Sequence, residues 1–150
     1  LTPWRSLIVC EETRLQMEEE VIERLRELNQ SVPIPLELPT HEDLVEVGEL
    51  LLIHLPREYK FFLQEVGDVI YGSLEPCTAS DSQLHTYIPD VTAQAWDLGL
   101  PRHLIPICEL NGDYYAIDPE GEIQFWEAGE IADEVWDSIW HWARDVWLES

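Results

Sequence analysis

The sequence predicts a single α+β domain: a mostly antiparallel β-sheet with a C-terminal three-stranded meander, helices packed against that sheet and a tryptophan-rich terminal helix. Two observations support this prediction. Turn signals divide residues 104–126 into three runs of β-branched, aromatic and apolar residues, and apolar residues at helical spacing follow over residues 134–148. The chain has 150 residues, enough for one well-buried core, and neither a repeat nor a linker indicates a second domain.

The N-terminal part of the chain changes character at Met17. Residues 1–16 show no clear period, and we expect an extension in which residues 4–9 could pair as an edge strand. Residues 18–29 predict an amphipathic helix, because apolar residues recur three and four positions apart and acids fill the first turn.

Two more helices are expected before residue 68. Thr40 and Asp43 have the spacing of a capping box at the start of the first helix. Its buried stripe consists of Leu44, Val47 and Leu51. Pro56 suits the first turn of the next helix, where its missing N–H costs nothing, and Gly67 suits its C-terminal end. The residues of this helix expected to face the core are Tyr59, Phe62, Leu63 and Val66.

The middle of the chain predicts shorter elements. Residues 69–71 and Leu74 have the composition of short strands, and residues 77–90 that of a polar surface loop or edge. Residues 91–98 predict a short helix that ends at Gly99.

The meander is defined by its turns, Asn-Gly-Asp at residues 111–113 and Asp-Pro-Glu-Gly at residues 118–121. In its last two runs apolar and polar residues alternate, so we expect one face toward the core and one acidic face toward solvent. The residues expected to face the core are Tyr115, Ile117, Ile123 and Phe125.

The terminal helix is expected over residues 134–148. Its apolar residues fall within an arc of about 160° at 100° per residue. They are Val135, Trp136, Ile139, Trp140, Trp142, Ala143, Val146 and Trp147. The tryptophans could form a recognition surface, but the polar opposite side favours a helix that packs them across the sheet.

Charge is the most unusual property of this chain, which carries 31 acidic and 8 basic residues and a net charge of −23. Such a charge repels nucleic acid and anionic membranes and attracts basic partners. Because no apolar run is long enough for a membrane span and the three cysteines show no paired spacing, we expect a cytoplasmic protein with reduced thiols.

Residues capable of chemistry are scattered. Ser73 lacks the flanking glycine of a nucleophile elbow, and no histidine has a second ligand at helical spacing. Alternating acids at residues 118–122 would hold at most a weak surface cation, and no glycine-rich phosphate loop is present. We therefore expect no catalytic activity, no metal and no cofactor.

Three segments resemble the SUKH superfamily, the domain of the fungal cell-wall-assembly regulators and of many bacterial toxin-immunity proteins. They are LPRHLIPICELNGDYYAIDPEGEIQFWE at residues 100–127, LPREYKFFLQEVGD at residues 55–68 and YGSLEP at residues 71–76. The resemblance covers roughly residues 18–148, so we expect a SUKH-like domain of residues 17–150 after an extension of residues 1–16. It implies a protein-binding module without catalytic residues.

Two functions remain open at this point: an immunity protein that neutralises a basic nuclease-type or deaminase-type toxin through an acidic surface, and a regulatory or scaffold protein that docks a cellular partner. For the first, the predicted contact residues are Asp113, Glu120, Glu122, Glu127 and Glu130, with Tyr114 as an aromatic anchor. Asp118 is less favoured because its side chain is expected to cap its own turn. An enzyme would need several acids to converge in one pocket.

Overall fold

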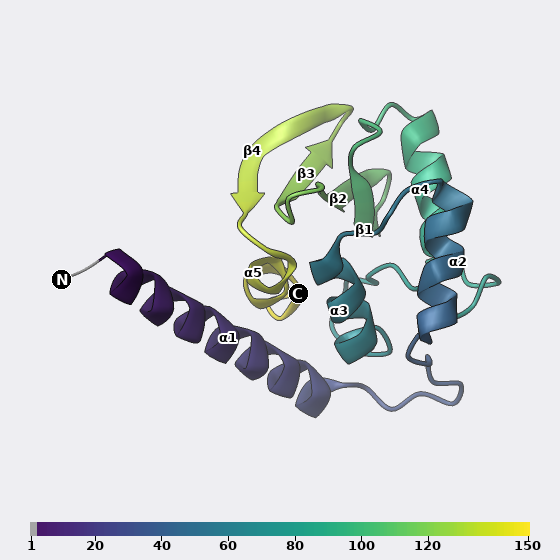
Figure 1. Cartoon of the computed structure of the whole chain (residues 1–150). Coiled ribbons are helices and arrows are strands. Elements are labelled where there is room, and N and C mark those ends of the chain that lie inside the picture. Colours follow the sequence, from purple (N-terminus) through teal and green to yellow (C-terminus); the bar gives the residue numbers. More distant parts are fainter. Residues whose placement is uncertain (1–2) are drawn as a thin grey trace.

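The computed structural model describes the backbone of residues 3–150 and the side chains of residues 14–150. Its elements follow one another as helices, an antiparallel sheet and a terminal helix (Figure 1). In chain order they are α1 (Pro3–Leu28), α2 (His41–Leu51), α3 (Arg57–Val66), α4 (Ile88–Asp97), β1 (Ile105–Leu110), β2 (Asp113–Ile117), β3 (Ile123–Glu127), β4 (Glu130–Trp136), α5 (Ile139–Trp142) and the π-helical turn η1 (Ala143–Trp147). The predicted α+β class is confirmed.

The sheet contains the predicted meander and one more strand. Its strands lie in the order β1-β2-β3-β4, and every neighbouring pair is antiparallel. The turn between β1 and β2 has positive φ at both Asn111 (53°) and Gly112 (87°), as a two-residue hairpin turn requires. Ala128 (53°) and Gly129 (83°) form a turn of the same kind between β3 and β4. The predicted three strands are therefore correct, and β4 was missed.

Both faces of the sheet are covered, contrary to the expected single solvated face. Tyr114 and Trp126 are buried on the side of α4, where a Cβ at Gly99 would lie 3.8 Å from the Trp126 ring. On the other side Tyr115 stacks on Phe125, with 4.5 Å between ring centroids, and packs against Trp142. The side chains of the two adjacent tyrosines thus pack on opposite faces of the sheet.

Helix α2 has the predicted capping box: the Asp43 backbone N–H donates to Thr40 Oγ1 (3.1 Å), and the Thr40 N–H donates to Asp43 Oδ2 (2.9 Å). Helix α3 begins after Pro56, and all of the residues predicted to face inward are buried. At its end a Cβ on Gly67 would approach the Leu63 carbonyl oxygen to 2.3 Å, so only glycine fits there.

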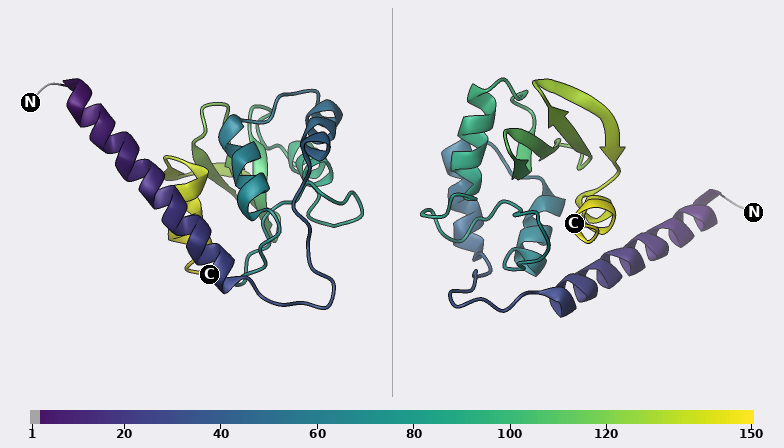
Figure 2. Two further views of the ribbon diagram at one scale, coloured as in Figure 1. Left: turned by 60° about the horizontal axis from the view of Figure 1, so that its bottom comes forward. Right: turned by 180° about the vertical axis from the view of Figure 1, so that it is seen from behind.

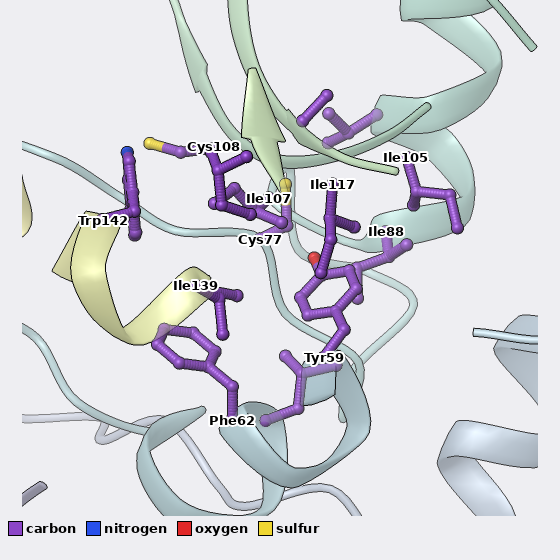
Figure 3. Close-up of a cluster of buried hydrophobic side chains, with 14 of the residues drawn as sticks. Tyr59, Phe62, Cys77, Ile88, Ile105, Ile107, Cys108, Ile117, Ile139 and Trp142 are labelled. Atoms are coloured by element: carbon purple, nitrogen blue, oxygen red, sulfur yellow. The ribbon is translucent and has the colours of Figure 1, made fainter. Parts of the chain in front are cut away.

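The core lies between α3, the sheet and α5 (Figure 3). Tyr59 is fully buried, and its hydroxyl donates to the Pro106 carbonyl oxygen of β1 (3.0 Å). Phe62 lies beside Trp140, with ring centroids 5.2 Å apart. Helix α3 is therefore attached to the sheet by a hydrogen bond and to α5 by aromatic packing.

The predicted terminal helix begins too early. Val135 and Trp136 belong to β4, and α5 starts only after Ser138, whose side chain accepts from the His141 N–H. Trp140, Trp142 and Trp147 are buried against the rest of the core, so the packing interpretation of the tryptophans is confirmed. The periodicity continued into residues 134–136 by coincidence, because strand and helix patterns share apolar residues at these spacings.

Two segments in the first half of the chain also differ from expectation. Residues 4–9 are helical, so the edge strand considered there is wrong. The C-terminal half of α1 packs on the domain through Val21 and Leu25, whereas its N-terminal end points away from the body (Figures 1 and 2). Residues 69–74 form no regular strand, and the isolated bridges that follow join Pro76 to Cys108 and Thr78 to Tyr87.

The loop expected over residues 77–90 is exposed in its middle and at Asp90 but buried at its start. Cys77, Thr78 and Ala79 are buried, and Thr78 Oγ1 lies 2.9 Å from Thr86 Oγ1. Residues 88–90 already belong to α4, and Ile88 and Pro89 among them are buried. The small residues at the start of the loop therefore belong to the structural core.

The free thiols of Cys77 and Cys108 are expected to be unreactive because both are buried. Burial is the main cause that raises the pKa of Cys108 to about 12 and that of Cys77 well above its ordinary range. In a Cys10→Ser background, which leaves only these thiols, reaction with Ellman's reagent at pH 8 should be at least about 100-fold slower than in denaturant, because the thiolate is the reactive form. Comparable rates in the two conditions would contradict the buried placement.

Candidate partner-binding surface

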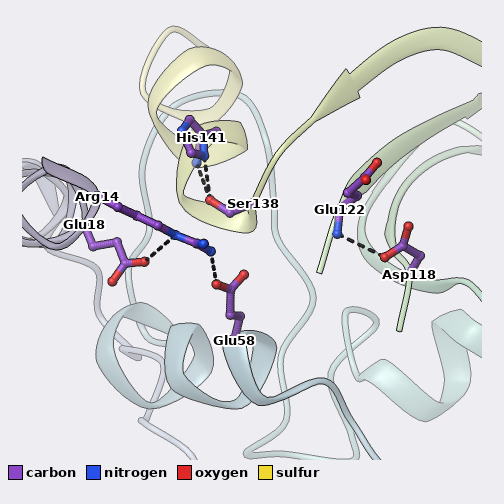
Figure 4. A network of polar contacts seen from close by, with 7 residues as sticks. All are labelled: Arg14, Glu18, Glu58, Asp118, Glu122, Ser138 and His141. Carbon is purple, nitrogen blue, oxygen red and sulfur yellow. Dashed lines mark hydrogen bonds and ion pairs between the residues drawn. The ribbon is translucent and has the colours of Figure 1, made fainter. Parts of the chain in front are cut away.

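The turn between β2 and β3 is organised by Asp118. Its Oδ1 accepts hydrogen bonds from the backbone N–H groups of Glu120 (2.9 Å) and Glu122 (3.0 Å) (Figure 4). Gly121 has a φ of 95°, which this tight turn requires. Asp118 therefore caps its own turn as the sequence predicted, and the Glu120 side chain is left exposed while Glu122 is half-buried.

The opposite end of the sheet carries a second acidic group. Glu127 and Glu130 face each other across the turn between β3 and β4, and both are exposed. Asp113 is half-buried beside them, and its Oδ1 accepts from the Ala128 backbone N–H (3.1 Å). Like charges directly opposite on paired strands are destabilising, so a cationic partner would relieve a repulsion that already exists here.

The predicted contact residues do not form one cluster. Glu122 and Glu127 stand at the two ends of β3, roughly 16 Å apart for five residues of extended chain. Asp113 lies beside Glu127, but Glu122 approaches neither of them. Tyr114 is only 1% exposed and packs against Trp126, so its predicted role as a surface anchor is wrong.

Strand β4 connects the two acidic groups. It runs from Glu130 at one end of the sheet to Trp136, which pairs with Ile123 at the other. Asp133, Glu134 and the following Asp137 are exposed along it. We call the exposed acids of this hairpin the β4 acidic strip: Glu127, Glu130, Asp133, Glu134 and Asp137.

No positive charge is available nearby in the sequence to neutralise the strip. The chain has no lysine or arginine between Arg102 and Arg144. Arg144 pairs with its neighbour Asp145 (2.8 Å), and the Arg102 guanidinium lies over the Trp96 ring at 5.1 Å. The strip also acts on a neighbouring side chain. Burial is the main cause that raises the pKa of Tyr115, and nearby charges, which include Glu134 and Glu127, raise it further.

The sequence-based prediction missed Asp133, Glu134 and Asp137 because it assigned part of β4 to the terminal helix. Two signals could have located the strand. Ala128-Gly129 lies between two apolar-containing runs as a hairpin turn does, and Asp137-Ser138 offers helix caps directly before residue 139. Together they leave residues 130–136 as a strand.

A serine also lies beside a histidine at the start of α5. Ser138 Oγ lies 2.7 Å from His141 Nδ1 and accepts from the His141 backbone N–H (3.3 Å). Ser138 is fully buried and occupies the N-cap of α5 (Figure 4). This contact is that of a helix cap, because a substrate could not reach the hydroxyl. No group of three or more potential metal ligands occurs among the residues that the structure describes.

An apolar groove of about 510 Å³ lies at the C-terminal end of α2. Its lining includes Val45, the exposed Leu52, Ile53 and Lys60. Helix α2 is on the side of the molecule opposite to β4 (Figure 1), so the groove does not belong to the acidic strip. None of the helices between residues 3 and 150 has the length and apolar character needed to cross a membrane.

An α+β domain with a four-stranded antiparallel meander, a Gly-Asp-Tyr-Tyr segment that enters its second strand and an aromatic terminal helix is the architecture expected of the SUKH superfamily. The chain belongs to this superfamily: the family model SUKH_5, described as SMI1-KNR4 cell-wall, matches residues 18–148. Membership indicates a protein-binding module of the immunity or SMI1/KNR4-like type.

Among solved structures, the chain is similar to one described as a crystal structure of a protein from Pseudomonas syringae pv. tomato. The two share 57% sequence identity and superpose with a TM-score of 0.86, over 88% of this chain and 99% of the other. The comparison with curated proteins found no match.

Proposed function

We propose that this protein is a non-catalytic immunity protein of the cytoplasm, which binds and neutralises a basic toxin domain of the nuclease or deaminase type. The observation that carries the proposal is the β4 acidic strip, an exposed strand whose acids have no basic residue near them in the sequence. Enzymes that act on nucleic acid have basic clefts because their substrate is a polyanion. An acidic strand can occupy such a cleft in place of the substrate.

Charge complementarity also fits the timing that immunity requires. A producing cell must capture its toxin before the toxin reaches nucleic acid, so a fast association rate is an advantage. Electrostatic steering can raise association rate constants to about 10⁸–10⁹ M⁻¹s⁻¹ at low salt, against about 10⁵–10⁶ M⁻¹s⁻¹ without steering. The net charge of −23 gives this chain a strong attraction for a basic partner.

The test begins with the purified chain as bait in a lysate of its native cells, with bound proteins identified after washes at about 50 mM and about 500 mM salt. The captured protein is then purified, and its nuclease or deaminase activity is measured with increasing amounts of the chain. We expect one basic protein whose activity falls to zero at equimolar chain. Capture of a non-toxin protein, or a toxin that stays active when saturated, would instead favour the regulatory or scaffold function.

A further inference from the structure

Strand β4 is an open edge of the sheet, and β1 is not. The outer side of β1 is covered by the chain before α4, because Pro76 forms a bridge with Cys108 and the Cys77 N–H donates to the Ile107 carbonyl oxygen (2.8 Å). Within residues 3–150, no bridge or backbone hydrogen bond joins β4 to anything other than β3. Figure 1 shows β4 as the outermost strand, curved away from α2 and α4.

The register indicates which backbone groups point outward from this edge. Glu127 and Glu130 flank a two-residue turn, which makes them a hydrogen-bonded pair in an antiparallel ladder. The alternation then directs the N–H and C=O groups of Ile131 away from β3, and likewise those of Val135, the partner of Gln124. A bulge opposite Phe125 separates these two positions and bends the strand.

The side chains along the edge are apolar at its two outward positions and acidic between them. Ile131 and Val135 are 41% and 49% exposed and lie on the same face as the buried Trp126, so they extend the apolar face of the sheet beyond its cover. Asp133 and Glu134 stand between them and are exposed. An added strand would thus meet free backbone groups, an apolar row and negative charges.

We propose that the free edge of β4 is a strand-addition site that receives an extended segment of the partner in which lysine or arginine alternates with apolar residues. The proposal rests on the proposed function and specifies how the acidic strip makes its contact. Partner main-chain groups would pair with Ile131 and Val135, and basic side chains would lie beside Asp133 and Glu134. A second copy of this chain is a poor occupant, because its own acids would face the same acids.

The first test uses the chain alone and with an eight-residue peptide of alternating lysine and valine. Hydrogen exchange by NMR should show fast exchange at the Ile131 and Val135 amides in the free protein and protection of both on peptide binding. A peptide of alternating glutamate and valine tests charge, and a lysine-valine peptide with proline at every second valine tests pairing. Neither control should bind measurably.

The second test is Val135→Pro. Because the Val135 N–H points away from β3, proline there leaves the sheet intact but removes the donor of the site. We expect an unchanged fold by NMR and peptide binding at least about tenfold weaker, whereas Val135→Ala should weaken binding less than about threefold. If Val135→Pro unfolds the protein, Ile131→Pro provides the same test at the other outward position.

Several outcomes would overturn the inference. Slow exchange at both amides in the free, dilute protein would show that the edge is already covered. Protection that rises with protein concentration would identify a second copy as the occupant. Salt-sensitive peptide binding without amide protection would refute strand addition but leave binding through the β4 acidic strip intact. A toxin that is neutralised equally well when the acids of the strip are replaced would refute both.

Discussion

Replacing Trp140 with alanine is expected to lower the free energy of unfolding by about 3–5 kcal/mol. Its side chain is fully buried at the junction of α3 and α5, where its ring lies 5.2 Å from that of Phe62 and 5.8 Å from that of Phe61. Alanine would leave a cavity between two helices that the surrounding backbone can fill only in part. Urea unfolding followed by circular dichroism measures the difference directly.

Trp140→Phe provides a matched control. The indole N–H of Trp140 is buried and has no hydrogen-bond partner in the described structure, so it lowers stability in the native protein. Phenylalanine keeps most of the aromatic contact and removes this N–H, and we expect a loss of no more than about 2 kcal/mol. Equal losses in the two variants would mean that the aromatic packing around Trp140 is not what stabilises the junction.

Reversing three charges of the strip is expected to have the largest effect on function. In the variant Glu130→Lys, Asp133→Lys and Glu134→Lys, the association rate constant with the toxin should fall by about 10–1,000-fold at low salt. The reason is that the three lysines replace attraction by repulsion at the surface that meets the partner. Stopped-flow mixing at several salt concentrations checks this expectation, and the difference between wild type and variant should shrink as salt increases.

The control variant carries the same change of charge elsewhere. Glu42, Glu46 and Glu49 are exposed on α2, on the opposite side of the molecule from β4 (Figure 1). Their replacement by lysine should slow association by only a few-fold, through the change in net charge. If both triple variants lose the same amount, net charge alone drives association and the strip is not the contact surface. Thermal melting shows whether each variant is folded.

Local sequence was sufficient wherever one short-range signal decided the structure. The capping box of Thr40 and Asp43, the inward side of α3 and the Asn-Gly turn between β1 and β2 all appear as predicted, because each depends on residues within a few positions of one another. The role of Asp118 as a turn cap belongs to the same class. Two of the three SUKH-like segments, residues 55–68 and 100–127, contain such locally determined structure.

Tertiary packing decided which side of each strand is buried. Tyr114 and Tyr115 are adjacent residues of the same type. Because α4 and α5 cover opposite faces of the sheet, Tyr114 is buried on the side of α4 and Tyr115 packs on the side of α5. An alternating pattern indicates that a strand is half-buried, but it cannot show that a second layer covers the other side.

For the predicted acidic contact residues, too, the sequence shows the charge and only the folded structure shows the arrangement. That residues 109–137 are acidic and contain no lysine or arginine is a property of the sequence alone. Their arrangement as two groups at opposite ends of β3, joined along an open edge by β4, follows from pairing between residues that only the folded sheet brings together. Composition thus determined that this surface is acidic, whereas the strand register, set by the hairpin turns and by the buried faces of the sheet, determined where the acidic groups lie.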